Sequence, residues 1–355
     1  MSNIYRIALV GAGIAERQAQ GLSWLKDKFE IVQLCSLDRE RGEKVCASYG
    51  IPEYGQDFEA LLTRDDIDII SICTPPYLHY QMTEKVLLAG KHAICEKPLF
   101  GSLAECDQME KLSARTGKIV MPIFQYRYGK GLQKLKRLIA EGLAGRPFMT
   151  TIETHWWRPQ SYFDVEWRGK WATELGGGFL GHAIHAHDML TYVHGPVAEV
   201  SAMGGPLMND IEVEDNMVAS VRMQNGSYAA LSMSLSSRKE ISRLRWCFED
   251  LTVESDLSPY TMYREPWFFT GKDEAHQKRI DELLADYAHH EDGYSRQYEL
   301  LYDALEKGAP APVTIADGRH ALELVAAAYL SERTGQRVSL PIAKDHPIYN
   351  GWNPA

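Results

Sequence analysis

The segment IYRIALVGAG, residues 4–13, indicates how the chain begins to fold. Its apolar, β-branched run is typical of a buried strand, and the residues after Gly13 change to helical spacing. Gly11 permits a tight turn between the two elements, and Gly13 lets a pyrophosphate approach the helix N-terminus. Glu16 stands where such turns usually carry a third glycine or an alanine, although Ala15, one residue earlier, can take that place. The alternative is a strand–helix turn without a ligand. The predicted contacts in this turn are Gly11, Gly13, Ile14 and Ala15.

Strand-like and helix-like stretches alternate from this segment up to residue 126. Between the strand-like runs lie stretches with helical spacing and many charged residues. This alternation predicts right-handed βαβ units and a doubly wound parallel sheet, an α/β Rossmann domain over residues 1–126. The further strand-like runs are FEIVQLCS (29–36), IDIISICT (67–74), KHAICEK (91–97) and GKIVMPIF (117–124).

Residues 127–355 follow a different pattern and predict a second domain. One helix with a glycine exit is followed by longer alternating strands, and Asn225-Gly226 is typical of a hairpin turn between two of them. We expect an α+β domain with a large, mostly antiparallel open sheet that is covered on one face. Helices near 293–307 and 317–335 close the chain, and the last helix is a candidate for packing back on the first domain.

Composition and charge exclude several functions. The 355 residues carry a net charge of −10, and no basic patch is visible, so we expect no nucleic-acid partner. No apolar run reaches membrane-spanning length, and no apolar segment follows a basic leader, so we expect a cytoplasmic protein without a membrane partner. The six cysteines have no paired spacing and are interpreted as reduced thiols, not as a disulfide frame or a zinc site.

The end of the second predicted strand bears on the choice of dinucleotide. An acidic residue there usually binds the ribose 2′-hydroxyl of NAD, but this strand runs into Ser36. A small hydroxyl with Arg39 and Arg41 nearby can accept a 2′-phosphate, so the pattern favours NADP over NAD, with Ser36 and Arg39 at the adenosine ribose. The alternative is that both arginines lie on a solvated helix face and Asp38 binds the ribose.

Lys97 lies in HAICEKPLFG, residues 92–101, at the end of an apolar run. Pro98 disfavours helical geometry at the lysine, which therefore stays extended at the carboxyl end of a strand, where open α/β sheets bind ligands. The Lys97–Pro98 bond is also a candidate for the cis form. An amine there can hold a hydroxyl oxygen and move its proton. Taken alone, a surface lysine at a strand end is the simpler interpretation.

Several motifs together resemble the Gfo/Idh/MocA oxidoreductases in order and spacing. The resemblance implies a Rossmann domain, an α+β domain with a large open sheet, and a nicotinamide cofactor. It also implies hydride transfer to or from a secondary alcohol or ketone of a sugar, inositol or related polyol. The motifs are GAG near the N-terminus, CTPPYLH (73–79), AGKHAICEKPL (89–99), FQYRY (124–128), H-x-x-D (185–188) and DGRHALELVAAAYLSERTGQRVSLP (317–341).

The resemblance also implies roles for individual residues. Lys97 orients the alcohol oxygen, His185 exchanges the proton, and the carbinol hydrogen faces the nicotinamide. Many relatives carry an aspartate four residues before this histidine, where the chain has Gly181. Either His182 replaces that aspartate, or Lys97 and His185 suffice. The other predicted cofactor contacts are Thr74, Pro75 and His79, with Glu96 and Lys97 near the nicotinamide ribose.

The segment GGGFLGHAIHAHDMLTYVHG, residues 176–195, predicts one helix bounded by glycines. At this spacing His182 and His185 share a face, and His187 is turned away. We expect Asp188 to fix helix packing or the histidine tautomer. A metal site built from His182, His185 and Asp188 is conceivable, but no metal is predicted, because the family reaction uses none and no further ligand is evident.

The segment HWWRPQSYFDVEWRGKW, residues 155–171, is rich in tryptophan and arginine. Tryptophan faces stack on sugar rings, and arginines bind hydroxyls or a carboxylate. The predicted substrate contacts are therefore Trp167, Arg168 and His155, together with His182. The alternative is that these rings pack a long connection or a subunit interface.

An exposed sheet face in the second domain would need covering, so we expect a homodimer or homotetramer. Two other functions stay open. One is a glycosidase that uses tightly held NAD in a closed redox cycle. The other is a non-catalytic dinucleotide-binding regulator, which the retained lysine–proline motif disfavours.

Overall fold

The computed structural model describes residues 3–285, 287 and 293–354. The chain forms two compact units: unit 1 comprises residues 1–125 and 293–319, and unit 2 comprises residues 126–292 and 320–355. The division made from the sequence left residues 293–319 with the second domain, whereas here they form part of unit 1.

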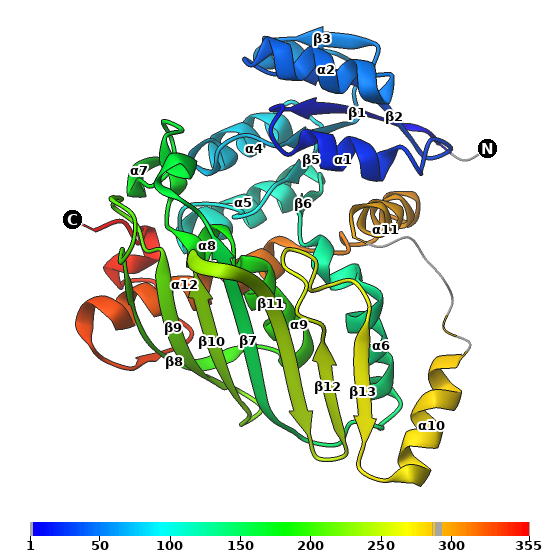
Figure 1. Ribbon diagram of the computed structural model, residues 1–355. Coiled ribbons are helices and arrows are strands. Elements are labelled where there is room, and N and C mark those ends of the chain that lie inside the picture. The colour runs from blue at the N-terminus through cyan, green and yellow to red at the C-terminus, as the bar shows by residue number, and fades with distance from the viewer. Residues whose placement is uncertain (1–2, 286, 288–292, 355) are drawn as a thin grey trace. The chain divides into compact units, whose positions relative to one another are not determined.

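Unit 1 contains a six-stranded parallel sheet in the order β3-β2-β1-β4-β5-β6 (Figure 1). This order is that of a doubly wound dinucleotide-binding sheet, which confirms the predicted fold class. The short strand β3 was not predicted. The strands are β1 (Tyr5–Val10), β2 (Phe29–Cys35), β3 (Glu53–Gly55), β4 (Ile69–Ile72), β5 (His92–Cys95) and β6 (Val120–Pro122).

The helices of unit 1 begin where capping side chains satisfy free backbone N–H groups. The carboxylate of Asp38 accepts from Arg41 N at the start of α2, and Ser102 Oγ accepts from Glu105 N at the start of α5. The helices are α1 (Ala15–Leu22), α2 (Arg39–Tyr49), α3 (Phe58–Leu62), α4 (His79–Leu88), α5 (Leu103–Thr116) and α11 (Tyr294–Lys307), with a 3₁₀ turn η1 (Pro76–Leu78).

Unit 2 is built on an eight-stranded sheet in the order β13-β12-β11-β7-β10-β9-β8-β14. Every pairing is antiparallel except β7 with β10, as expected for a mostly antiparallel sheet. The predicted hairpin joins β9 to β10. The strands are β7 (Pro147–Trp157), β8 (Val197–Gly205), β9 (Asn216–Met223), β10 (Tyr228–Ser234), β11 (Ser236–Phe248), β12 (Leu251–Ser255), β13 (Trp267–Gly271) and β14 (Val338–Ser339).

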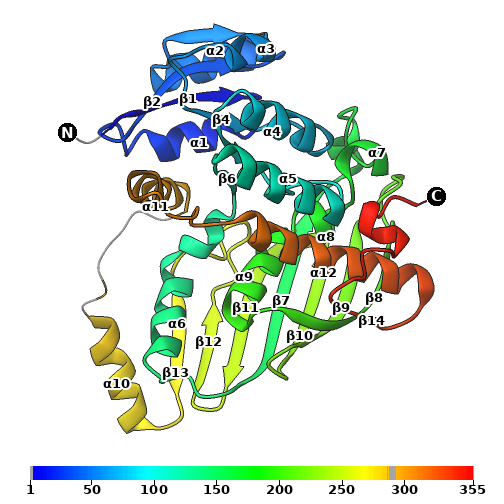
Figure 2. The ribbon, with the colours of Figure 1, turned by 180° about the vertical axis from the view of Figure 1, so that it is seen from behind.

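Helices cover one face of this sheet, as seen in Figure 2 for α6, α9 and α12. The prediction of one helix over residues 176–195 is wrong, because α8 ends at Gly181 and α9 begins at Ile184. The helices of unit 2 are α6 (Lys130–Ala140), α7 (Trp171–Glu174), α8 (Gly178–Gly181), α9 (Ile184–His194), α10 (Glu274–Ala285) and α12 (Ile315–Thr334, in unit 2 from residue 320), with the 3₁₀ turns η2 (Gln125–Tyr128), η3 (Gln160–Phe163) and η4 (Pro347–Asn350).

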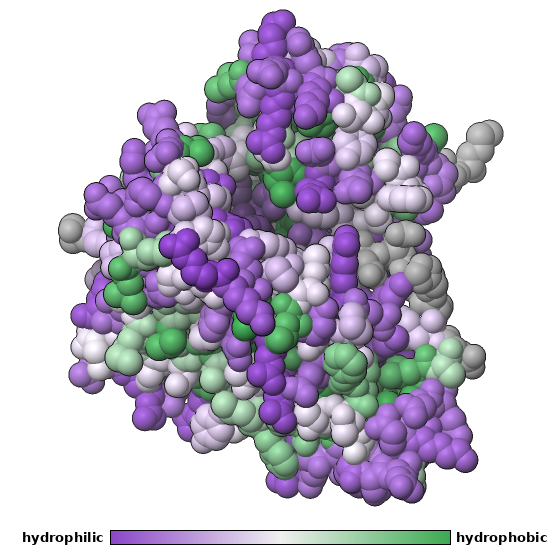
Figure 3. Space-filling view, in the orientation of Figure 1, coloured by the Kyte–Doolittle hydropathy of each residue, from purple (hydrophilic) through white to green (hydrophobic). Residues whose placement is uncertain are grey.

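The other face of the sheet is open. Along β7 the side chains alternate between buried and half-buried positions, which is the pattern of a sheet covered on one side. Figure 3 views this open face and shows polar and apolar residues intermixed over it. Its exposed apolar side chains include Met149, Met203, Val218, Tyr228 and Phe268. Among the described residues, no helix is both long and apolar enough to cross a bilayer.

Candidate active site

The glycine turn of unit 1 has room for a ligand. Gly11 has φ +98°, and a Cβ there would lie 2.6 Å from the carbonyl oxygen of Cys73, so only glycine fits. A Cβ on Gly13 would meet nothing within 4 Å, which leaves open space before α1. Ala15 is fully buried and Ile14 is exposed, so Ala15 takes the close-packing place. These residues fit the pyrophosphate of a dinucleotide at a helix N-terminus.

In the loop after β2, the charged side chains make different contacts from those predicted from the sequence. Asp38 caps α2, and its backbone N–H donates to Ser36 Oγ at 3.2 Å. Arg39 pairs with Glu43 at 3.3 Å. Arg41, by contrast, reaches the glycine turn, where its Nη2 donates to the carbonyl oxygen of Gly13 at 2.8 Å. Arg41 is therefore better placed than Arg39 to meet a group bound at this turn.

His79 connects the loops that follow β4 and β5. Its Nδ1 lies 2.7 Å from the carbonyl oxygen of Pro98, and its Nε2 lies 2.9 Å from that of Thr74. The ring is fully buried, and burial lowers its pKa. His79 therefore joins the Thr74–Pro75 segment to the segment that carries Lys97. Both segments belong to the predicted cofactor site.

Lys97 is half-buried directly after Glu96, at the carboxyl end of β5, and the Lys97–Pro98 bond is cis, as the sequence suggested. The backbone N–H of Lys97 donates to Glu96 Oε2 at 3.2 Å. Glu96 is itself buried, with its carboxylate bonded to Gln18 and Tyr294 inside unit 1. The structure thus places the buried Glu96 carboxylate in contact with the backbone of Lys97.

In unit 2, His185 lies on α9 in a stack of aromatic rings. Its imidazole and the phenol ring of Tyr126 have centroids 4.2 Å apart and planes 16° from parallel. Tyr126 packs in turn on Tyr263, with centroids 4.4 Å apart, and its hydroxyl donates to the carbonyl oxygen of Tyr260. His185 is 6% exposed, so the stack holds one face of its ring.

Asp188, the second residue of the H-x-x-D motif, forms a buried ion pair with Arg127. The guanidinium donates from Nε to Oδ2 at 2.8 Å and from Nη2 to Oδ1 at 2.6 Å. The side chains are 3% and 0% exposed. This bidentate ion pair joins η2 to α9. Asp188 therefore contributes to helix packing, which is one of the two roles predicted for it.

The other histidines differ in their surroundings. His182 Nε2 lies 3.2 Å from the Tyr162 hydroxyl, and its ring meets Trp156 edge-on. Burial lowers the pKa of His187 to about 3 and that of His194 to about 4, as expected for structural histidines. A Cβ on Gly181 would meet nothing within 4 Å, so a larger side chain has space at this position.

The tryptophan-rich segment 155–171 folds partly on itself. Arg168 pairs with Glu174 at 3.1 Å, and its guanidinium lies over the rings of Tyr162 and Trp167. His155 points to the open face of the sheet, where its Nε2 lies 2.8 Å from Ser232 Oγ. Because neighbouring residues of β7 face opposite sides, His155 lies away from Trp156 and the histidine segment.

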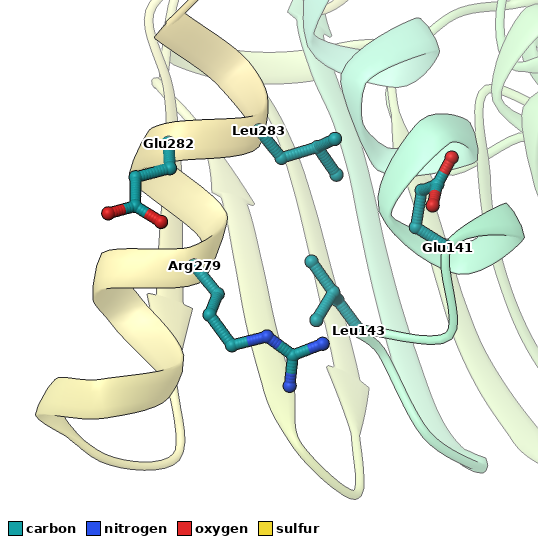
Figure 4. Close-up of a pocket in the computed structure, with 5 residues that line it drawn as sticks. All are labelled: Glu141, Leu143, Arg279, Glu282 and Leu283. Atoms are coloured by element: carbon teal, nitrogen blue, oxygen red, sulfur yellow. The ribbon is translucent and has the colours of Figure 1, made fainter.

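A shallow surface pocket lies elsewhere in unit 2. Figure 4 shows that its lining residues come from α10 and from the end of α6 and the loop after it, and no predicted site residue is among them. Among the described residues, no group of three or more His, Cys, Asp or Glu side chains is arranged to hold a metal ion. The pocket is lined by Glu141, Leu143, Arg279, Glu282 and Leu283.

The parallel sheet and its glycine turn define a protein with a Rossmann-type dinucleotide-binding domain. Residues 5–124 match the family model described as an oxidoreductase family with an NAD-binding Rossmann fold, and residues 132–250 match the GFO/IDH/MocA C-terminal domain. The chain therefore belongs to the Gfo/Idh/MocA family of oxidoreductases and carries its NAD-binding domain, which confirms the resemblance seen in the motifs.

Individual relatives are distant. D-glucoside 3-dehydrogenase of Escherichia coli is 25% identical, with 96% of this chain and 98% of that protein covered. The 4-carboxy-2-hydroxymuconate-6-semialdehyde dehydrogenase of a Sphingobium species is 29% identical, with 65% and 72% covered. Among solved structures, the WlbA dehydrogenase of Bordetella pertussis, in complex with NADH and UDP-GlcNAcA, matches with a TM-score of 0.84 and 26% identity, with 96% and 100% covered.

Proposed function

We propose that this protein transfers a hydride between a nicotinamide dinucleotide and a secondary alcohol or ketone of a sugar, inositol or related polyol. The observation that carries the proposal is the position of Lys97 at the carboxyl end of β5, in a domain that matches the family's NAD-binding model. Its backbone N–H donates to Glu96 Oε2, and His79 contacts the carbonyl oxygen of the next residue, Pro98. Two similar proteins support this substrate class. One is named D-glucoside 3-dehydrogenase, and the other, the WlbA dehydrogenase, is in complex with NADH and UDP-GlcNAcA.

We assign the proton chemistry to two residues. The Lys97 amine holds the oxygen of the substrate alcohol, and the His185 imidazole exchanges the hydroxyl proton as a general acid–base group. The dinucleotide, when bound, supplies the hydride chemistry. The protein supplies orientation: Tyr126 fixes the plane of His185, and His79 fixes the loop that carries Lys97.

We propose that the cofactor is NADP in preference to NAD. Ser36 leaves the end of β2 without an acidic side chain, and the carboxylate of Asp38 is engaged as the cap of α2. Arg41 brings a guanidinium to the glycine turn, where it can pair with a 2′-phosphate. The proposed cofactor contacts are Gly11, Gly13, Ile14, Ser36, Arg39, Arg41, Thr74 and Pro75, and the fully buried Ala15 and His79 pack behind them.

His182, Trp167 and Arg168 are proposed as substrate contacts, with the Tyr162–His182 pair next to the space at Gly181. His155 is the weakest of the predicted contacts, because it lies on the opposite face of β7. We further propose that the protein works in the cytoplasm as a homodimer or homotetramer. All six cysteines are unpaired, and the open sheet face carries exposed apolar side chains that a second copy can cover.

A substrate panel tests the proposed function. Purified protein is mixed with sugars, inositols and sugar acids, with NADP⁺ and NAD⁺ in parallel, and the absorbance of the reduced nicotinamide is recorded. We expect reduction with at least one polyol and a higher kcat/KM with NADP⁺. Cleavage of a glycoside without net cofactor reduction would instead identify a redox-cycling glycosidase. Cofactor binding without turnover on any member of the panel would contradict the proposal.

A further inference from the structure

A buried hydrogen-bond network joins Glu96 to helix α11, which lies about two hundred residues further along the chain. Glu96 Oε1 accepts from Gln18 Nε2 at 2.8 Å and from the Tyr294 hydroxyl at 3.0 Å. Gln18 Oε1 accepts in turn from the Tyr298 hydroxyl at 2.7 Å and from Ser71 Oγ. Glu96 is 3% exposed, and Gln18, Ser71 and Tyr298 are fully buried.

Close packing holds α11 in place for these contacts. A Cβ on Gly21 of α1 would lie 2.7 Å from Cβ of Tyr294, so the two helices approach closely only because residue 21 is glycine. Ser295 Oγ donates to the carbonyl oxygen of Gly21 at 3.1 Å, and Gln297 Nε2 donates to that of Pro122 at 2.7 Å. These contacts hold α11 so that the hydroxyls of Tyr294 and Tyr298 lie next to Glu96 and Gln18.

The network bears on the charge of Glu96. Burial raises the pKa of this carboxyl group above its ordinary value, and the positive charge of Lys97 and the hydrogen bonds from Gln18 and Tyr294 offset part of that rise. Hydrogen bonds to an ionised carboxylate are stronger than those to a neutral group. Each donor on Glu96 therefore favours its ionised form, and the ionised form in turn favours the ammonium form of Lys97.

Several described groups near Glu96 are neutral at neutral pH. The pKa values of the Tyr294, Tyr298 and Cys73 side chains are raised well above their ordinary values by burial, so these groups stay neutral. Burial lowers the pKa of His79, and the positive charge of Lys97 lowers it further. Glu96 is the carboxyl group next to Lys97 in the chain, and the positive charge of Lys97 lowers its pKa.

We propose that Tyr294 is a positioning residue for Lys97 and acts through the Glu96 carboxylate. One oxygen of that carboxylate accepts from Tyr294, and the other accepts from the backbone N–H of Lys97, so the tyrosine holds the group that holds the lysine. Tyr298 is one step further away, because it contacts Gln18. The inference deepens the proposed function, since it rests on the role given there to Lys97.

The test measures the reactivity of the Lys97 amine in the full-length protein without substrate. Acetic anhydride at limiting amounts modifies the protein over a pH series, and peptide mass spectrometry quantifies acetylation at Lys97 against an exposed lysine in the same digest. The variants are Tyr294→Phe and Glu96→Gln. The matched control is Tyr302→Phe on the same helix, because the Tyr302 hydroxyl is buried without a hydrogen-bond partner among the described residues.

We expect the pH of half-maximal acetylation to fall in Tyr294→Phe and to fall further in Glu96→Gln. A shift of one unit makes the amine react about tenfold faster at a pH below its midpoint. The plateau at high pH, which reports access and not charge, should stay the same in all variants. Tyr302→Phe should match the wild type.

Two outcomes overturn the inference. One is a wild-type midpoint in both Tyr294→Phe and Glu96→Gln proteins that melt at the wild-type temperature. The other is an equal shift in Tyr302→Phe, which would show a general packing effect. Because no turnover is measured, either outcome is independent of whether Lys97 is catalytic, and a failure of the substrate panel leaves this result standing.

Discussion

The imidazole of His185 and the phenol ring of Tyr126 lie face to face, with centroids 4.2 Å apart and planes 16° from parallel. The tyrosine is held on its far side by Tyr263 and at its hydroxyl by the carbonyl oxygen of Tyr260. A residue of η2 therefore stacks on the ring of a histidine on α9 and constrains the plane of that ring.

Replacing Tyr126 tests this stack. Tyr126→Leu removes the aromatic surface, and we expect kcat to fall by about tenfold to a hundredfold with a smaller change in KM, because a reacting group that is slightly misplaced loses rate. Tyr126→Phe keeps the ring and loses only the bond to Tyr260, so its kcat should lie close to the wild-type value. Steady-state kinetics on the best substrate measures both. Equal losses in the two variants would show that the hydroxyl matters and the stack does not.

The Arg127–Asp188 pair should matter for stability more than for chemistry. Asp188→Asn removes a carboxylate that pairs with a buried guanidinium, and breaking such a pair costs about 3–5 kcal/mol in the free energy of unfolding. The double variant Arg127→Met/Asp188→Leu removes both charges and should be less destabilised than the single variant. Urea unfolding followed by circular dichroism measures all three proteins. A single variant as stable as the wild type would contradict the assignment.

Glu214 predicts a pH dependence of stability in unit 2. Its carboxylate accepts from Gly177 N, Phe179 N and the Tyr329 hydroxyl, and burial raises its pKa from an ordinary 4.5 to about 7. Since the folded state then holds the proton more tightly, this contribution to stability is complete below the unfolded pKa and is lost as the pH rises through about 7. The loss amounts to roughly 3 kcal/mol.

Glu214→Gln removes this titration. Urea midpoints at several pH values between 5 and 8 should show the variant gaining on the wild type as the pH rises, and the gap should level off above pH 7. Parallel curves for the two proteins would mean that Glu214 does not titrate in this range.

Much of the fold follows from rules that act locally along the chain. Gly11 could be predicted because a tight turn at φ +98° admits only glycine, and the alternation of strands and helices gave the parallel sheet. The helix break between Gly181 and Ile184 was missed, because His182 and Ala183 carry no helix-breaking signal. Strand β13 and helix α10 were also missed, since short amphipathic stretches gain their stability from tertiary packing.

The candidate site was less accessible to sequence reasoning. Whether His155 or Trp156 faces the helix-covered side of the sheet depends on strand register, and a shift of one position reverses the answer. That Arg41 and not Arg39 reaches the glycine turn depends on where the first turn of α2 points. The FQYRY motif contains Tyr126 and Arg127, yet nothing local indicates that one stacks on His185 and the other pairs with Asp188.

The cofactor preference can be tested at Ser36 and Arg41. Ser36→Asp places a carboxylate where a 2′-phosphate would bind, and Arg41→Gln removes the guanidinium at the glycine turn. Each change should weaken NADPH binding about tenfold or more, the equivalent of one lost charge-assisted hydrogen bond, while NADH binding changes less. Arg39→Gln should have a smaller effect, because Arg39 is paired with Glu43. Fluorescence titration with both nucleotides measures this, and unchanged NADPH affinity in Arg41→Gln would remove Arg41 from the site.

The most direct test of the account is the single-turnover rate of cofactor reduction in Lys97→Met, measured with the best substrate of the panel and with the nucleotide already bound. The account predicts a loss of about 10²- to 10⁴-fold with nucleotide affinity unchanged. The control Lys111→Met, exposed on α5, should react at the wild-type rate. A Lys97→Met protein that binds the cofactor and turns over normally would contradict the central claim.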